Sequence, residues 1–262
     1  MKKFSQKELY MDVSVCKKHI PNSITCCNLI CGCIAISFAV KGDLPLALLF
    51  IILGAVFDFF DGMVARLLGV SSPIGKELDS LADVVTFGVA PSSIVFYELL
   101  VVEYPSILND SVIVSLVPYL AFLVAAFSAV RLAKFNLDTR QTTSFIGLPT
   151  PANALFWGSL IVGFGEYLEQ YAWFMPALLV AILLSSWILV AEIPMFALKF
   201  KHWGYKSNEL KYCFVLFSVV ALVASIVLGV ATGNSRLCYS GFSLIIVVYV
   251  LLSIIADTKK VS

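Results

Sequence analysis

The chain has 262 residues, of which 60% are hydrophobic and only 13% are charged, and its net charge is +1. Soluble proteins carry roughly 25% charged residues, so this composition excludes an ordinary soluble domain and predicts an integral membrane protein. A net charge this small gives no reason to expect a nucleic-acid partner. The seven cysteines include no Cys-x-x-Cys pair, and we interpret them as reduced, apolar helix residues rather than metal ligands.

The first 21 residues are polar and basic and lack the apolar stretch of a signal peptide. We expect residues 1–21 to form a cytoplasmic N-terminal segment, because its lysines favour that side of a membrane. If this segment is helical, four apolar residues share one face: Phe4, Leu9, Val13 and Cys16. Two interpretations stay open for it, an interfacial amphipathic helix on an anionic membrane surface and a frayed basic tail.

Apolar runs of membrane-spanning length follow this segment, with short connections between them. Only helices and closed barrels satisfy the backbone within lipid, and runs this long predict helices. We therefore expect an all-α integral membrane protein with one transmembrane domain over residues 22–257. About eight transmembrane helices are predicted, at residues 22–40, 44–66, 78–102, 112–133, 149–168, 173–198, 210–232 and 237–256.

The basic residues are distributed unevenly between the two sides that eight spans create. All 18 lysines and arginines except Lys41 and Arg236 fall on the side of the two termini. Because basic loops stay in the cytoplasm, both termini are expected there, in a multi-pass protein of the cell membrane. The connection between the second and third predicted helices lies on the same side.

Four aspartates flank that connection: Asp58, Asp61, Asp79 and Asp83. The first two are three residues apart and the last two are four residues apart, so each pair shares one face of its helix. Two antiparallel helices joined by a short turn would point all four carboxylates into one space.

Small residues and a helix start accompany these acids. Gly62 and Ala65 continue the face of the first pair, and Gly75 lies on the face of the second pair, so room is left beside the carboxylates for a ligand. Ser72 and Pro73 predict the start of the second helix, because serine caps helix N-termini and proline is favoured in the first turn.

Four carboxylates near a low-dielectric region need a compensating charge. No histidine or cysteine is near them in the sequence, and oxygen ligands alone favour hard ions such as Mg²⁺, Mn²⁺ or Ca²⁺. Two divalent ions roughly 3.5–4 Å apart would bind a diphosphate substrate. The alternative from another class is a carboxylate-based ion or proton transporter. The clustering of the acids at one side of the membrane, without an inverted repeat, favours the metal site.

The aspartate segment resembles the complete signature of the CDP-alcohol phosphatidyltransferases, which reads here Asp58-x-x-Asp61-Gly62-x-x-Ala65-Arg66, eight residues, then Gly75-x-x-x-Asp79-x-x-x-Asp83. Residues 20–36, 75–92 and 145–154 are similar to the bacterial and archaeal phosphatidylserine synthase branch of that family. The resemblance implies a six-helix catalytic core, transfer of a phosphatidyl group from CDP-diacylglycerol to serine with release of CMP, and a homodimer among membrane lipids. Glycerol 3-phosphate and inositol phosphate are the alternative acceptors within the family.

The resemblance also implies roles for the signature residues. Asp58, Asp61 and Asp79 would be the main ligands of the divalent ions, and Asp83 would act both as a ligand and as general base. The residues expected to contact the CDP-lipid are Thr25, Asn28, Gly62, Ala65, Arg66 and Gly75. Two of these keep an alternative: Asn28 either lines the nucleotide pocket or bridges helices, and Arg66 either pairs with phosphate or only orients its helix.

The acceptor site is expected near the start of the fifth predicted helix. Pro149 and Pro151 bracket that start, where free backbone N–H groups favour an anion. Four residues are predicted to bind the acceptor there: Arg131, Lys134, Thr150 and Asn153. The alternative for the two cations is orientation of the helix or pairing with lipid headgroups. Glu192, in the sixth predicted helix, is expected to be a structural acid that faces the bundle.

Overall fold

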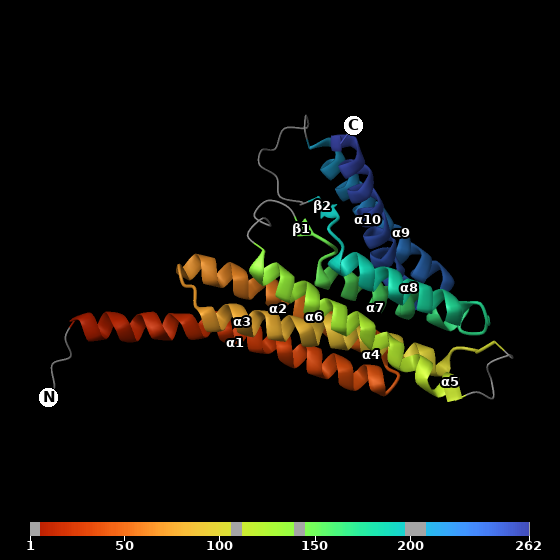
Figure 1. Cartoon of the computed structure of the whole chain (residues 1–262), viewed down its shortest axis with the longest axis horizontal. Coiled ribbons are helices and arrows are strands. Elements are labelled where there is room, and N and C mark those ends of the chain that lie inside the picture. Colours follow the sequence, from red (N-terminus) through yellow and green to blue (C-terminus); the bar gives the residue numbers. More distant parts are fainter. Residues whose placement is uncertain (1–5, 106–111, 139–144, 197–207, 262) are drawn as a thin grey trace.

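The protein is represented by a computed structural model that describes residues 6–105, 112–138, 145–196 and 208–261. Within these ranges the chain is almost entirely helical, as predicted (Figure 1). The helices are α1 (Gln6–Val40), α2 (Leu44–Leu68), α3 (Pro73–Asp83), the π-helical η1 (Val84–Val89), α4 (Ala90–Val101), α5 (Val112–Leu116), the 3₁₀ turn η3 (Val117–Ala121), α6 (Phe122–Leu137), α7 (Thr150–Leu168), α8 (Phe174–Val190), α9 (Glu209–Thr232), the 3₁₀ turn η4 (Ser235–Tyr239) and α10 (Ser240–Val261).

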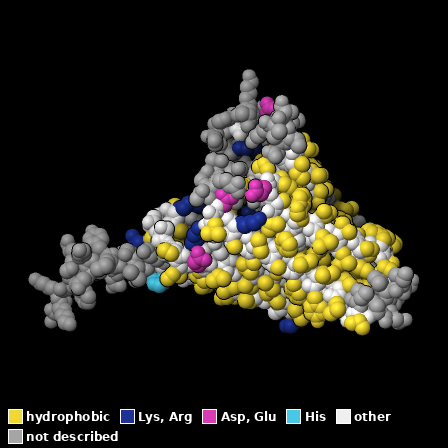
Figure 2. Space-filling view, in the orientation of Figure 1, with side chains coloured by type: hydrophobic (Ala, Val, Ile, Leu, Met, Phe, Trp, Pro, Cys, Tyr) yellow, Lys and Arg dark blue, Asp and Glu magenta, His cyan; other side chains and the backbone are white. Residues whose placement is uncertain are grey.

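These helices form eight apolar segments in the predicted order, because α3, η1 and α4 run on continuously, as do α5, η3 and α6, and η4 and α10. Six segments of the described chain are long and apolar enough to cross a membrane; α7 is not counted among them, and α8 is a shorter apolar helix. On the face shown in Figure 2, hydrophobic side chains cover most of the described surface, as contact with lipid requires. The prediction of an all-α integral membrane protein is confirmed.

Helix α1 is longer than its predicted span. It runs without interruption from Gln6 to Val40, and the part that is apolar enough to cross a membrane begins at His19. Its first turns extend beyond the other helices in Figure 1. Residues 1–5, and the side chains of residues 6–16, lie outside the described part of the chain, so the amphipathic face predicted there stays a prediction.

The turn between α2 and α3 forms as the sequence predicts. Gly69 ends α2 in the left-handed conformation, with φ 62°, and the N–H groups of Gly69 and Val70 close the helix end on the carbonyls of Arg66 and Ala65. Ser72 then caps α3, because its Oγ accepts the N–H of Gly75 at 2.9 Å, and Pro73 occupies the first helical position. The two caps fix the antiparallel course of α2 and α3.

Helices α1, α2 and η1 pack closely together next to this turn. Cβ atoms built on Gly32 and Gly54 would lie 2.4 Å and 2.5 Å from side-chain atoms of Thr86, so only glycine lets the three helices approach this closely. The main core continues from there toward the other end of the bundle, around fully buried residues such as Leu48 and Trp157. The acidic turn therefore adjoins tightly packed helices.

The segments that flank α7 and α8 form a short strand pair next to the last helices, and α10 packs directly against α7. Strand β1 (Phe145–Ile146) pairs antiparallel with β2 (Pro194–Met195), so the segment before α7 is bonded to the segment after α8. A second core lies beside this pair, where Met195 and Phe214 pack with Tyr249 of α10. In Figure 1, α9 and α10 rise from the bundle at an angle next to β2.

One boundary prediction and one residue placement are wrong in this region. The sixth helix was predicted over residues 173–198, but α8 ends at Val190 and residues 194–195 form a strand. Glu192 was expected to face the bundle from that helix, but it follows the helix end and is exposed. The apolar residues Ile193, Pro194 and Met195 extend the hydropathy of α8 without extending its helix, because Pro194 cannot donate a helical N–H.

Candidate functional site

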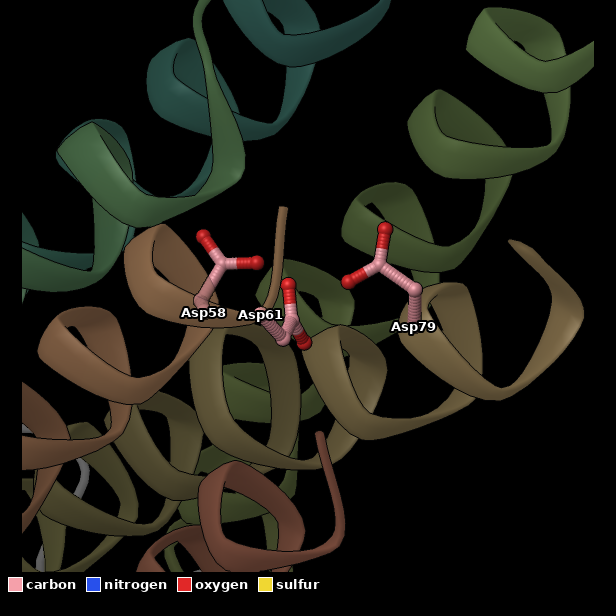
Figure 3. A group of neighbouring side chains, drawn as sticks. All are labelled: Asp58, Asp61 and Asp79. Atoms are coloured by element: carbon pink, nitrogen blue, oxygen red, sulfur yellow. The ribbon is translucent and has the colours of Figure 1, made fainter. Parts of the chain in front are cut away.

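Three aspartates meet between α2 and α3. One carboxylate oxygen each from Asp58, Asp61 and Asp79 can be chosen so that all three lie within 4.8 Å of one another, and Figure 3 shows these side chains converging from the two helices. Asp61 is buried, and the Oδ1 atom of Asp79 is buried without a hydrogen-bond partner among the described residues. An oxygen-only group of this kind fits a hard divalent cation, whose charge would offset the repulsion among the carboxylates.

Asp83 lies beside this group and interacts electrostatically with all three acids, but it is not part of the group. It lies one turn further along α3 and is only 8% exposed, and it is absent from the set of carboxylates close enough to share an ion. Asn28 of α1 donates its Nδ2 hydrogen to Asp83 Oδ1 at 3.2 Å, and Thr86 Oγ1 donates to the backbone carbonyl of Asn28 at 3.0 Å. Asp83 is therefore held in place from α1 and η1, whereas the other three acids face one another.

A pocket of about 240 Å³ adjoins the three-aspartate group, between α1, α2 and α3. Its lining consists of Pro21, Asn22, Thr25, Asp61, Gly62, Ala65, Val70, Ser71, Ser72, Gly75, Lys76 and Asp79. Four of the six residues predicted to contact the CDP-lipid are among them. The pocket explains the small residues, since a Cβ built on Gly62 would meet no atom within 4 Å and would project into free space.

Two residues predicted for the same role lie elsewhere. Asn28 is fully buried below the pocket, where it contacts Asp83, and Arg66 is exposed on the last turn of α2. Thr25 does line the pocket, and its hydroxyl donates to Asp61 Oδ2 at 2.5 Å. Thr25 therefore orients one of the three clustered carboxylates.

Sequence reasoning missed several polar residues of the pocket, of which Lys76 is the most informative. Among the lining residues it is the one basic side chain. Its position immediately after Gly75, inside the aspartate pattern, was the available signal. Asn22 was also missed; its Oδ1 would lie 3.0 Å from a Cβ built on Gly75, so α1 and α3 approach closely at the pocket.

The four residues predicted to bind an acceptor divide into two groups. Arg131, Thr150 and Asn153 are buried, and each has a buried polar atom without a partner among the described residues. Buried polar atoms are normally paired, because leaving one unsatisfied costs roughly 1–3 kcal/mol. Lys134 is exposed, and its Nζ donates to the carbonyl of Val190 at 3.4 Å, near the end of α8.

Arg131 lies between the acidic site and the C-terminal helices. Its guanidinium stacks over the ring of Phe135 at 5.4 Å and interacts electrostatically with Asp83 and Tyr249. Thr150 is the first residue of α7, so the predicted helix start is confirmed. Buried charges are normally paired, and the interaction with Asp83 offsets part of the cost of burying this one.

Comparisons with known proteins agree with a site of this chemistry. A family model described as CDP-alcohol phosphatidyltransferase matches residues 18–254. The CDP-diacylglycerol–serine O-phosphatidyltransferase of Bacillus subtilis is 40% identical over 137 residues, which are 51% of this chain and 70% of that protein. The proteins of the same name from Mycobacterium leprae and Methanocaldococcus jannaschii are 34% and 36% identical, over 67% and 58% of this chain and 57% and 63% of their own lengths.

Proposed function

The chain belongs to the CDP-alcohol phosphatidyltransferase family, and from this premise we propose that it transfers the phosphatidyl group of CDP-diacylglycerol to the hydroxyl of L-serine and releases CMP. The relatives named above carry the name of this reaction. The observation that supports the proposal most is the convergence of Asp58, Asp61 and Asp79 beside the 240 Å³ pocket. The family membership and the position of the acids at one end of their helices argue against the transporter alternative.

Asp58, Asp61 and Asp79 are the proposed ligands of divalent metal, Mg²⁺ or Mn²⁺ and less readily Ca²⁺, with two ions as the proposed number. Bound metal would neutralise the diphosphate and stabilise the CMP that leaves. Thr25 keeps Asp61 oriented toward this group through its hydroxyl. The cytidine and phosphates are assigned to the pocket, where Gly62, Ala65 and Gly75 leave space. Arg66, which is exposed near the turn, is proposed to pair with phosphate at the mouth.

Asp83 is proposed as the general base. The serine hydroxyl oxygen bonds to the β-phosphorus of CDP-diacylglycerol, the bond between that phosphorus and the CMP oxygen breaks, and the hydroxyl proton passes to a carboxylate oxygen of Asp83. Asn28 fixes the orientation of this carboxylate by donating a hydrogen bond to its Oδ1. Asp83 is also proposed as a fourth metal ligand. Measurements of metal affinity distinguish this role from the role of general base.

Serine is assigned to the buried polar group around Arg131. Its carboxylate would pair with the guanidinium, and Thr150 and Asn153 have buried atoms without a partner among the described residues for the remaining polar contacts. The N–H groups at the start of α7 favour the same anion. Lys134, which is exposed, is proposed as a second cation of the serine site, outside the buried group. Glycerol 3-phosphate and inositol phosphate remain the alternative acceptors, and a release assay with each acceptor, measuring CMP, distinguishes them.

Replacing Arg131 with glutamine is expected to raise KM for serine about tenfold or more, because a charge-assisted hydrogen bond contributes roughly 1.5–3 kcal/mol. KM for CDP-diacylglycerol should stay nearly constant, and Arg131→Lys should recover part of the serine affinity. Steady-state CMP release at varied serine and varied CDP-lipid measures both constants. A rise confined to the lipid-nucleotide constant would reassign Arg131 to phosphate binding.

Enlarging Gly62 is expected to block the pocket without unfolding the protein. Gly62→Val should raise KM for CDP-diacylglycerol about tenfold or more, because its side chain would fill space that the nucleotide needs. Gly54→Ala is the contrasting variant: its Cβ would lie 2.5 Å from Thr86 Cγ2 and 2.9 Å from Asn28 Oδ1, so it should lower thermal stability instead. Unchanged nucleotide affinity in folded Gly62→Val would remove the pocket from the proposal.

The orientation and assembly are part of the same proposal. Both termini and the acidic turn are placed on the cytoplasmic side of the cell membrane, because the lysines and arginines gather there. Residues 1–21 are assigned to a cytoplasmic segment and residues 22–257 to the catalytic domain. A homodimer, which the family resemblance implies, is the proposed assembly.

A further inference from the structure

We propose that Lys76 binds the diphosphate of the CDP-lipid directly, as the fixed cation of the pocket. This inference rests on the proposed function, since it assigns a ligand to the same site, but it concerns a residue outside the defining positions of the aspartate pattern. Lys76 lines the pocket together with Asp61, Asp79 and Gly62, so its side chain and the carboxylate group bound one common space.

Helix α6 holds the Lys76 ammonium in position. Lys76 Nζ donates to the backbone carbonyl of Asn136 at 3.0 Å, and the side-chain amide of Asn136 donates to Ser80 Oγ of α3 at 2.8 Å. The Asn136 carbonyl belongs to the last turn of α6, where carbonyls have no intrahelical partner and carry the negative end of the helix dipole. Two hydrogen bonds thus join α3 to the end of α6, one donated from each helix, and they limit the motion of the lysine.

The hydrogen bond to Asn136 leaves the ammonium able to bind an anion. An ammonium group has three N–H donors, and Asn136 accepts one of them. Within the described chain, no carboxylate forms an ion pair with Lys76, although Asp61 and Asp79 line the same pocket. A lysine beside a pocket whose ammonium keeps free N–H donors can bind phosphate as a point charge.

Charge balance supports the same assignment. Asp61 and Asp79 make the pocket wall negative, and a diphosphate would be repelled unless cations intervene. Metal bound by the aspartates would offset their own charge first, and the substrate brings further negative charge. Arg66 is absent from the lining, and Arg131 is buried on α6 near Asp83. Lys76 is the cation that the described pocket lining itself supplies.

Titration of the full-length protein with CDP in the presence of Mg²⁺ tests this inference. Lys76→Gln keeps an N–H donor for the Asn136 carbonyl but loses the charge, so the fold should be preserved. We expect its Kd for CDP to rise about tenfold or more, while Lys76→Arg recovers most of the affinity. Lys41→Gln is the matched control. Lys41 follows the C-terminal end of α1, far along the helix from the pocket residues Asn22 and Thr25, so this variant should bind CDP like the wild type.

Titration with Mn²⁺ without nucleotide, and thermal unfolding, provide the separate readouts. Both should be nearly unchanged in Lys76→Gln, because Lys76 is assigned to the diphosphate and not to the metal. CDP affinity equal to that of the wild type would overturn the inference and leave Lys76 as a cap of α6, with the proposed function intact. Failure of the wild type itself to bind CDP would overturn the proposed function, and this inference with it.

Discussion

Asp79→Asn is expected to lower the rate of phosphatidyl transfer about a thousandfold or more, because it removes a ligand charge from the three-aspartate group. Asp79 faces Asp58 and Asp61 across the gap between α3 and α2. An asparagine has the same size, so packing around it should be retained. The fold should tolerate the change well, since fewer negative charges then face one another.

Activity, Mn²⁺ affinity and thermal unfolding are the measurements for this variant. Mn²⁺ affinity should fall together with activity, and excess chelator should abolish turnover of the wild-type protein. Glu77→Gln is the matched control, because Glu77 is an exposed acid on the same helix, two residues from Asp79, and it should leave both quantities unchanged. Full turnover in excess chelator would contradict metal dependence.

Asp83→Asn is expected to lower kcat by about two to four orders of magnitude, the usual contribution of a general base. Mn²⁺ and CDP affinities should change far less than in Asp79→Asn, because Asp83 lies outside the group of three carboxylates. Asn28→Asp should weaken catalysis in the same manner to a smaller degree, since it replaces the donor that fixes Asp83 by an acceptor of equal size.

Comparison of the two aspartate variants separates the two roles proposed for Asp83. Loss of Mn²⁺ affinity as large as in Asp79→Asn would assign Asp83 as a metal ligand. Retained Mn²⁺ affinity with a low kcat would assign it as the base. An unchanged kcat in a folded Asp83→Asn protein would contradict the role of base altogether.

The parts of the site that follow helical periodicity could be predicted from the sequence. The spacings of three and four residues place Asp58 with Asp61 on α2 and Asp79 on a face of α3, and local cap chemistry at Gly69 and Ser72 sets the turn between them. Each of these features depends on residues within one or two turns of one another. The convergence of the three carboxylates follows from them.

Other features depend on contacts between distant segments, and local patterns do not encode them. Asn28 and Asp83 are 55 positions apart, and Lys76 and Asn136 are 60 apart. The two partners come together only through the packing of α1, α3 and α6. Nothing in the neighbourhood of Asn28 distinguishes a pocket residue from one that orients a carboxylate, so its position beneath the pocket required the structure.

Hydropathy likewise could not locate the end of α8. The residues after Val190 remain apolar, yet Pro194–Met195 pairs as a strand with Phe145–Ile146, and Gly147 follows with φ 76°. A side chain at Gly147 would place its Cβ 2.5 Å from the carbonyl of Leu189. The strand pair depends on this close approach between two segments, which an average of hydrophobicity does not register.

The central claim, that this chain makes phosphatidylserine from CDP-diacylglycerol and serine, is tested most directly by identifying the products. Purified protein in detergent would receive CDP-diacylglycerol and isotopically labelled serine with Mg²⁺ or Mn²⁺, and lipid and nucleotide products would be quantified by mass spectrometry. We expect one labelled phosphatidylserine for each CMP released, and neither product in excess chelator or with Asp79→Asn. Formation of phosphatidylglycerol phosphate or an inositol lipid in preference to phosphatidylserine, when those acceptors compete with serine, would contradict it.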